Sequence, residues 1–457
     1  LLQLPFSFIF SAFIDFNMML TSELHPANYG MSIALLLTGC MAQSIGVVLE
    51  LKPRVAMMSA EAFVKYASRH YNKEFGKFKV YFDITLVILA VILSLLLTPV
   101  FQWIARRTGF LDVPQANHKG HRQPTPLLGG AAMFTSWILC IGAGLAVIHW
   151  FRIPFFTTAI AEHLPGLRNT AAGPLFFVAL GAFLAMLLGL IDDRRALSAG
   201  AKFSGQFLIA ALAATWGGVR VNVFLTDPVA VWCVTVFWIM LMMNSINFFD
   251  NMDGLAVGTI AIAMGFFTVI AALNHQFFIA TFSALTCGVC CGFWFYNYNP
   301  ATIFMGDSGS HFLGYLAAVI AAGVSFFDIS YSRSRFPILM PLFILALPLF
   351  DTAMVVLIRT RNRKPFWIGD HNHISHRFVR MGLSKKQAVL LVHLMALCIG
   401  LGILPVFWGD FRTAAILVAQ AMLFLLVITI LQFALSNRQD TRETPVNPPA
   451  EPEEKNR

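Results

Sequence analysis

Long apolar runs recur through most of the chain, and this repetition restricts the fold more than any other feature of the sequence. The runs are rich in Phe, Leu and Ala, and most are long enough to cross about 30 Å of hydrocarbon as a helix. Backbone amides inside hydrocarbon must be hydrogen-bonded within a helix or a closed barrel, and this composition favours helices. With 58% hydrophobic and 12% charged residues, the composition is that of an integral membrane protein. We therefore predict an all-α, polytopic membrane protein with about eleven transmembrane helices. The predicted spans are 81–104, 127–150, 174–191, 203–217, 228–246, 255–273, 276–296, 310–327, 336–358, 387–407 and 412–435.

Four short polar segments follow the ends of apolar runs. They are the pair Asp192-Asp193, the Asn- and Asp-rich segment 244–254, the segment 305–309 around a Gly-Asp pair, and the His-rich segment 371–377. Carboxylates are costly inside or beside a bilayer, so a recurrent set of them indicates a functional site. A single Asp at a helix end could instead be a solvated cap. We therefore treat these four segments as parts of one candidate site.

The distribution of Lys and Arg predicts the orientation of the spans. We number the segments that connect successive spans, beginning with the one after span 81–104. The odd-numbered connections carry most of the basic residues, which indicates that they are cytoplasmic. All four polar segments fall on odd-numbered connections, although groups placed by chance would fall on both faces. The sequence therefore predicts an active site on the cytoplasmic face. The net charge of +9 suits this face and also a phosphate-bearing substrate, and charge alone does not separate the two explanations.

The two ends of the chain differ from its middle. In residues 1–80 a weak apolar segment is followed by basic residues on what would be the outer side of the next span, which conflicts with the orientation above. We expect this stretch to be a non-native or separately evolved extension. Residues 81–435 are expected to form the transmembrane domain. The polar tail 436–457 is expected to be disordered and cytoplasmic.

The polar segments, taken in order, resemble those of a known superfamily. The sequence is similar to the polyprenyl-phosphate N-acetylhexosamine-1-phosphate transferases (glycosyltransferase family 4), over about residues 81–435. The matching motifs are Asp112-x-Pro114, Lys119-x-His121-x-x-Pro124, Asp192-Asp193, Lys202 with Gln206, the run from Asn244 to Gly254, Phe304-Met305-Gly306-Asp307, and the His-rich segment.

Two positions depart from the family pattern. The family usually has Gly directly after the residue that matches Asp250, whereas this chain has Asn251, a residue that tolerates left-handed backbone. The second departure is Ser375, which stands where the nearest bacterial members usually have an imidazole. If Ser375 only replaces a redundant imidazole, a Ser375→His variant keeps its activity.

The resemblance implies transfer of an N-acetylhexosamine 1-phosphate, with GlcNAc as the default sugar, from a UDP-sugar to undecaprenyl phosphate, with release of UMP. All reactants are anionic, so positioning and charge neutralisation dominate such a reaction. By resemblance, Mg²⁺, with Mn²⁺ as an alternative, is held by Asn247 and Asp307. The implied catalytic residues are Asp192, Asp193, Asp250, His373 and His376. The implied substrate-binding residues are Lys119, His121, Lys202, Asp253, Phe304 and Arg377.

The expected location is a bacterial cell membrane, with the lipid bilayer as a partner, no nucleic acid, and a homodimer left open. Two other functions remain open at this stage. The muramoyl-pentapeptide branch of the superfamily is one, although its loop of three His followed by Phe-Glu is missing here. An ion-coupled transporter is the other, for which Asp351, within a predicted span, is the one supporting residue.

Overall fold

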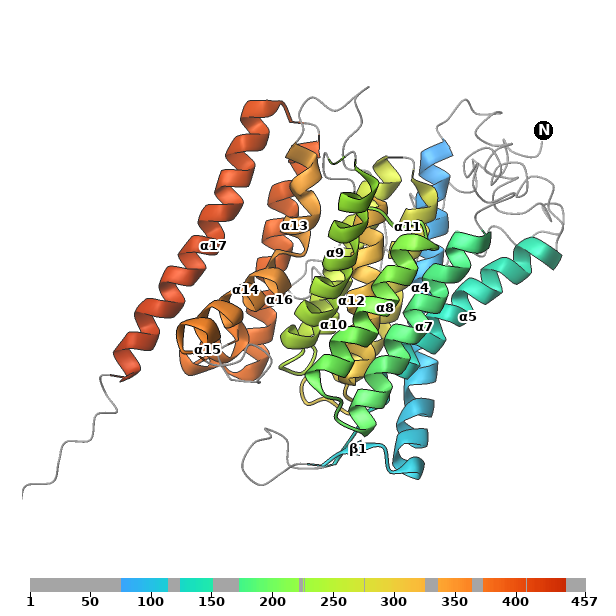
Figure 1. The fold of residues 1–457 in the computed structure, drawn as a ribbon, viewed down its shortest axis with the longest axis horizontal. Helices are drawn as coiled ribbons and strands as arrows, with labels where there is room; N and C mark the ends of the chain where they lie inside the picture. Colours follow the sequence, from blue (N-terminus) through green and yellow to red (C-terminus); the bar gives the residue numbers. More distant parts are fainter. Residues whose placement is uncertain are drawn as a thin grey trace, which may run out of the picture. The chain divides into compact units, whose positions relative to one another are not determined.

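Each of the eleven predicted spans overlaps one or more helices in the structure, a computed structural model that describes residues 75–113, 124–150, 172–221, 225, 227–274, 276–324, 336–363, 373–407 and 409–440. The chain divides into the units Leu1–Tyr66 and Ala67–Arg457, and every described residue belongs to the second (Figure 1). The α-helices are α4 (Phe75–Thr108), α5 (Gly129–Trp150), α7 (Ala172–Arg194), α8 (Ala199–Thr215), α9 (Pro228–Phe249), α10 (Leu255–Leu273), α11 (Phe277–Asn297), α12 (Gly306–Gly323), α13 (Met340–Ile344), α14 (Ala346–Arg361), α15 (Ile374–Arg380), α16 (Lys385–Ile403) and α17 (Phe411–Asp440), with 3₁₀ turns η1 (Phe336–Leu339) and η2 (Leu404–Phe407).

Fewer of these helices qualify as membrane spans than the sequence suggests. Seven helices in the described ranges are long and apolar enough to cross a membrane, or eight if the bent pair Pro337–Ile344 and Ala346–Arg361, which meet at 68°, forms one span. The protein is therefore an all-helical polytopic membrane protein with seven or eight candidate spans. Helix α8 is one predicted span that is too short. Its 17 residues extend only about 26 Å, less than the roughly 30 Å of hydrocarbon that a span must cross.

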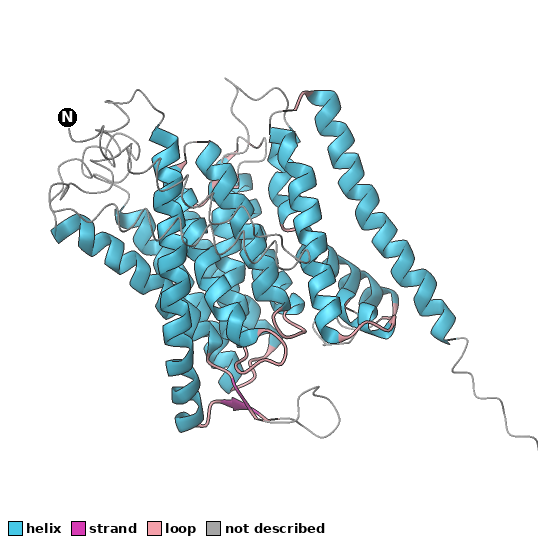
Figure 2. Ribbon diagram, turned by 180° about the vertical axis from the view of Figure 1, so that it is seen from behind, coloured by secondary structure: helices cyan, strands magenta, loops and turns pink. Residues whose placement is uncertain are grey.

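One small departure from a purely helical fold joins α4 to α5. Strand β1 (Leu111–Asp112) pairs antiparallel with β2 (Thr125–Pro126), with Leu111 opposite Pro126 and Asp112 opposite Thr125. This ribbon lies at one end of the bundle, beyond the C-terminal end of α4 (Figure 2). With strands of two residues each, it leaves the all-helical architecture unchanged.

Helix starts in this chain follow local capping chemistry. Asp227 begins α9 by accepting a hydrogen bond from the amide of Ala230 at 2.8 Å, and Pro228 follows at the first helical position, where a missing N–H costs nothing. Ser384 and Gln387 form a reciprocal capping box at the start of α16. These polar caps fix where the apolar segments begin.

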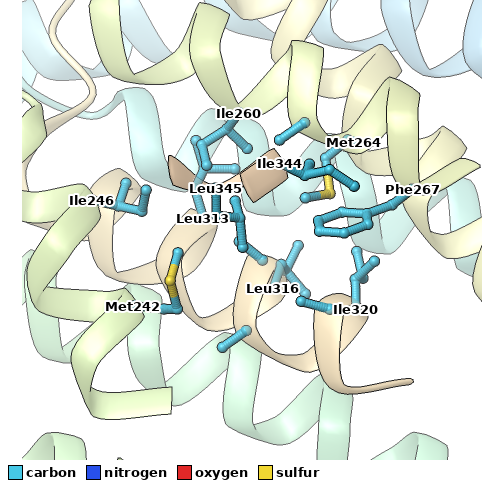
Figure 3. Packing of buried hydrophobic residues seen from close by; sticks show 14 of the residues in the cluster. Met242, Ile246, Ile260, Met264, Phe267, Leu313, Leu316, Ile320, Ile344 and Leu345 are labelled. Carbon is cyan, nitrogen blue, oxygen red and sulfur yellow. The ribbon is translucent and has the colours of Figure 1, made fainter. Parts of the chain in front are cut away.

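Helix α12 is the centre of the bundle. It packs against α5, α7, α9 and α10, and its residues from Ser308 to Ala321 are all buried. Because protein rather than lipid surrounds it, α12 can begin with polar residues. Figure 3 shows its apolar side chains interlocked with those of α9 and α10. The labelled residues from these three helices are Met242, Ile246, Ile260, Met264, Phe267, Leu313, Leu316 and Ile320.

Two glycines let the first turn of α12 touch its neighbours directly. A Cβ atom on Gly189 of α7 would lie 2.2 Å from the backbone oxygen of Asp307, and one on Gly130 of α5 would lie 2.2 Å from the amide nitrogen of Gly309. Neither neighbour is a flexible side chain that could move aside. Small residues that allow such backbone contact are a usual basis of helix association in membranes. The start of α12 is thus held between α5 and α7.

We predict that Gly189→Ala lowers thermal stability and activity together, because the added methyl group would overlap the Asp307 backbone and overpacking costs about 1–3 kcal/mol. Thermal unfolding in detergent measures the effect. Gly200→Ala, an exposed position on α8 with open space at its Cβ, is the control and should behave like the wild type. A Gly189→Ala protein as stable as that control would contradict the close approach.

The predicted orientation can be tested with exposed residues of the described helix ends. In a cysteine-free background, single cysteines at Ser198 and Ser384 should react with an impermeant maleimide only from the cytoplasmic side, and one at Arg220 only from the outside. Labelling of intact cells and inverted vesicles distinguishes the sides. Reaction of the Ser198 and Ser384 positions from opposite faces would rule out a one-sided site.

Candidate active site

The side chain of Asp193 caps the N-terminus of α12 from the end of α7. Its Oδ1 accepts a hydrogen bond from the amide of Asp307 at 2.8 Å, and its Oδ2 accepts one from the amide of Ser308 at 3.0 Å. The first amides of a helix have no partner within the helix, and the helix dipole favours a negative charge there. Both oxygens of Asp193 are therefore engaged in fixing α12 in place.

Lys202 links the two other carboxylates at this point. Its Nζ lies 2.8 Å from Oδ2 of Asp192 and 2.6 Å from Oδ2 of Asp307. Burial alone would lower the pKa of Lys202, but the charge of Asp307 and hydrogen bonds to both carboxylates raise it above its ordinary value. Burial alone would likewise raise the pKa of Asp307, but hydrogen bonding with Asp192 and the charge of Lys202 lower it to about 2. Lys202 and Asp307 thus remain an ion pair at neutral pH.

Asn247 approaches Asp307 from α9. Its amide nitrogen donates to Oδ1 of Asp307 at 2.7 Å and to the hydroxyl of Ser310 at 3.0 Å. The two oxygens of Asp307 are therefore contacted from α8 and α9, while its backbone amide is held from α7. The structure thus brings together Asp192, Asp193, Lys202, Asn247 and Asp307, which the sequence predicts as site residues.

Asp250 ends α9 close to the same cluster. Burial raises the pKa of its carboxyl to about 8, and the charges of Asp307, Asp193 and Asp253 act in the same direction. This carboxyl therefore carries a proton over much of the neutral range. Burial is the largest cause, and the neighbouring acidic groups add to it. Among the described residues, Lys202 pairs directly with Asp192 and Asp307.

Asp253 and Phe304 lie at the edge of the site, around the loop between α11 and α12. Oδ2 of Asp253 accepts hydrogen bonds from the side chain of Asn299 at 2.8 Å and from the amide of Ala301 at 3.1 Å. The backbone of Phe304 bridges to the ribbon and to α5, since its amide donates to Pro126 and its carbonyl accepts from Gly129. These contacts hold both residues in place beside Asp307.

The His-rich segment contributes α15. His373 precedes this helix, and its Nδ1 lies 2.7 Å from Oδ2 of Asp351 on α14, while Oδ1 of Asp351 accepts from the amide of Ile374 at 2.7 Å. The rings of His373 and His376 lie 6.3 Å apart, and Arg377 is buried. Asp351 is a residue that the motifs did not include. Its only signal in the sequence is a carboxylate within an apolar run.

The two departures from the family pattern contact each other. Ser375 is fully buried, and its hydroxyl donates a hydrogen bond to Oδ1 of Asn251. Asn251 in turn donates to the carbonyl of Phe248 at 3.0 Å. Arg363 is the residue other than glycine with positive φ among those described, so Asn251 does not use the left-handed backbone that the sequence suggested. The left-handed residue of this turn is Gly254, at φ 76°.

A polar network lies beneath Asp307. His311 Nδ1 is 2.7 Å from the carbonyl oxygen of Asp307, and His311 Nε2 is 2.9 Å from Nε2 of Gln206, which also pairs with Asn244. A carbonyl only accepts and an amide nitrogen only donates, so the contacts fit a neutral imidazole with its proton on Nδ1. His311 thus ties the first turn of α12 to α8. Its position four residues after Asp307 is the signal in the sequence that could have found it.

The donor set suits a hard divalent cation. Carboxylate and amide oxygens from Asp307, Asn247 and nearby aspartates are the ligands that Mg²⁺ prefers, and an excess of acidic groups attracts a cation. Within the described ranges, no three His, Cys, Asp or Glu side chains are arranged as a metal cage. Mg²⁺ commonly takes one or two protein carboxylates and completes its shell with phosphate and water.

Some predicted residues lie outside the described ranges. Lys119 and His121, predicted to bind substrate, fall in residues 114–123, and His371 falls in residues 364–372. The extension up to residue 74 and the tail from residue 441 also lie outside them.

Comparison with known proteins identifies the family. The profile of Glycosyl transferase family 4 matches residues 175–325, which include the Asp192 and Asp307 segments. Over 354 residues, the chain is 32% identical to the probable undecaprenyl-phosphate N-acetylglucosaminyl 1-phosphate transferase of Bacillus subtilis, covering 75% of this chain and 89% of that protein. The chain belongs to glycosyl transferase family 4. It is a phosphotransferase of the polyprenyl-phosphate N-acetylhexosamine-1-phosphate transferase group, as the sequence motifs predict.

Other glycosyl transferase family 4 proteins show the same relationship. The decaprenyl-phosphate N-acetylglucosaminephosphotransferase of Mycolicibacterium smegmatis is 30% identical over 366 residues, covering 75% of this chain and 86% of that protein. The phospho-N-acetylmuramoyl-pentapeptide-transferase of Clostridium acetobutylicum is 31% identical over 188 residues, but this covers only 37% of this chain and 59% of that protein. Residues 1–106 match a family of unknown function, DUF6198.

The buried Asn251–Ser375 contact predicts an outcome that differs from the sequence-based one. Ser375→His should lower activity, because the larger side chain has no room against Asn251, and overpacking costs about 1–3 kcal/mol. Asn251→Gly in the same protein removes the obstructing side chain and should restore much of the activity. Product formation by the two single variants and the double variant measures this coupling. Wild-type activity in Ser375→His alone would show that the position is roomier than the contact implies.

Proposed function

We propose that this protein transfers GlcNAc 1-phosphate from UDP-GlcNAc to undecaprenyl phosphate and releases UMP, as a first step of lipid-linked envelope glycan synthesis. The proposal rests on the extent of the match to the N-acetylglucosaminyl 1-phosphate transferase of Bacillus subtilis. It is supported by the cluster around Asp307, which combines a buried ion pair with several carboxylates at helix ends. The protein would act in a bacterial cell membrane, with its site on the cytoplasmic face.

The reaction exchanges one P–O bond for another. An oxygen of the lipid phosphate attacks the β-phosphorus of the UDP-sugar, the bond from that phosphorus to the bridging oxygen breaks, and UMP leaves with the electron pair. A phosphate monoester loses its second proton near pH 6, so the lipid phosphate is mostly a dianion at neutral pH. The main task of the site is therefore to bring anions together and to stabilise charge in the transition state.

The residues of the cluster would divide this task. Lys202 would contact phosphate oxygens with the ammonium group that now bridges Asp192 and Asp307. Asp307 and Asn247 would hold Mg²⁺ or Mn²⁺, which when bound neutralises phosphate charge. Asp193 would act by positioning, because both of its oxygens hold α12. A proton on Asp250 would reduce the negative charge that faces an incoming phosphate.

The remaining residues would bind the nucleotide and the pyrophosphate. We propose that His373, His376 and Arg377, brought by α15, contact the phosphates, and that Lys119 and His121 add cationic and hydrogen-bonding groups. Phe304 would stack on the uracil ring, and Oδ1 of Asp253 would accept a hydrogen bond from it. The division into an extension 1–80, a transferase domain 81–435 and a tail 436–457 belongs to the same proposal.

A membrane-fraction assay with a panel of UDP-sugars tests the function. UDP-GlcNAc should give magnesium-dependent release of UMP only when undecaprenyl phosphate is added. UDP-MurNAc-pentapeptide belongs in the panel, since that branch matches part of this chain. Preference for it would replace the proposed sugar, release without lipid would indicate a hydrolase, and no release with any sugar would contradict the proposal.

We further predict that Asp307→Ala and the isosteric Asp307→Asn lower kcat by about 10²-fold or more, without rescue by excess magnesium, because a group that stabilises transition-state charge is lost. The matched control is Asp227→Asn, an exposed carboxylate that only caps α9 and whose replacement still caps. UMP release measures both. Wild-type activity of an Asp307 variant would remove this residue from the mechanism.

A further inference from the structure

The carboxylate of Asp351 has two partners, and both belong to the start of α15. Asp351 is 1% exposed, and among the described residues its oxygens contact the His373 imidazole and the Ile374 amide. A buried carboxylate without partners is strongly destabilising, so this pairing accounts for an acidic residue within an apolar helix. The bond to the Ile374 amide holds the backbone at the start of α15. The bond to His373 is an additional contact.

The geometry decides which nitrogen of His373 carries a proton. With Asp351 ionised, its carboxylate can only accept hydrogen bonds, and the contact of 2.7 Å then places a proton on Nδ1 of His373. Nδ1 keeps this proton whether the ring is neutral or charged. Nε2 is then the ring nitrogen that does not contact Asp351, and it is the atom that can face a phosphate oxygen.

We propose that Asp351 is a positioning residue of the transferase, which fixes the tautomer and the orientation of His373 so that Nε2 serves the phosphates. This rests on the proposed function, in which His373 contacts the pyrophosphate. Asp351 acts through His373 and does not touch substrate. Its place on α14, bonded to the residue that precedes α15, connects α14 to the His-rich segment.

The first test is spectroscopic and needs no activity. In protein with ¹⁵N-labelled histidine, the His373 signals, identified by their loss in His373→Gln, should show a proton on Nδ1. Asp351→Asn keeps an oxygen for the Ile374 amide but presents an NH₂ group to the ring, so the proton should move to Nε2. Ser375→Ala is the control, because it breaks a different hydrogen bond of α15, to Asn251, and should leave the tautomer unchanged. A proton on Nε2 of neutral His373 in the wild type, or no change in Asp351→Asn, would overturn the proposal.

The second test asks whether Asp351 acts through His373. Asp351→Asn should lower kcat by about 10-fold or more with little change in KM, and it should cost nothing further in a His373→Gln background. Additive losses would show that Asp351 has only a structural role. A fully active His373→Gln variant would remove His373 from the proposed reaction and so overturn the functional part of the inference, whereas the labelling result would still report the tautomer. The two failures are thereby distinguished.

Discussion

The hydrogen bonds between Asp193 and the first amides of α12 are the interaction on which the rest of the site depends. They join the end of one apolar helix to the start of another, at a part-buried position where an unpaired amide or carboxylate is costly. Because α12 cannot move without breaking them, Asp307 stays within reach of Lys202 and Asn247. The glycines at 130 and 189 leave no space through which α12 could shift instead. The site is therefore assembled mainly by backbone contacts, and its charged side chains are placed on a framework that is already fixed.

Much of this arrangement follows from the sequence, and the reason is the membrane. Polar residues that end successive apolar helices on the same face must meet near one plane, so Asp192, Lys202, Asn247 and Asp307 could be grouped before any coordinates were known. The family match agrees with that grouping. The number of spans was less predictable. Apolar composition does not distinguish a helix surrounded by lipid from one surrounded by protein, and α12 is of the second kind.

What the sequence could not supply were pairings between residues far apart in the chain. Asp351 was an isolated acidic residue until its carboxylate was found against His373. Asn251 and Ser375 were two unrelated departures from a pattern, and their contact makes them one feature. Such pairs depend on how α14 and α15 pack against the end of α9, and hydrophobic periodicity carries no information about that packing.

The Asn251–Ser375 contact also bears on how sites of this kind can change over time. Around the charged cluster, a larger side chain would overlap the backbone or a buried neighbour. Single substitutions that change side-chain volume there are therefore expected to be destabilising. Compared with the family pattern, Asn251 in the turn after α9 is larger and Ser375 in α15 is smaller. The total volume of the two side chains therefore changes little. Paired replacements that conserve the total side-chain volume are therefore the route by which the sequence of this site can change. An unusual residue at one of these positions is best interpreted together with the residue that it contacts.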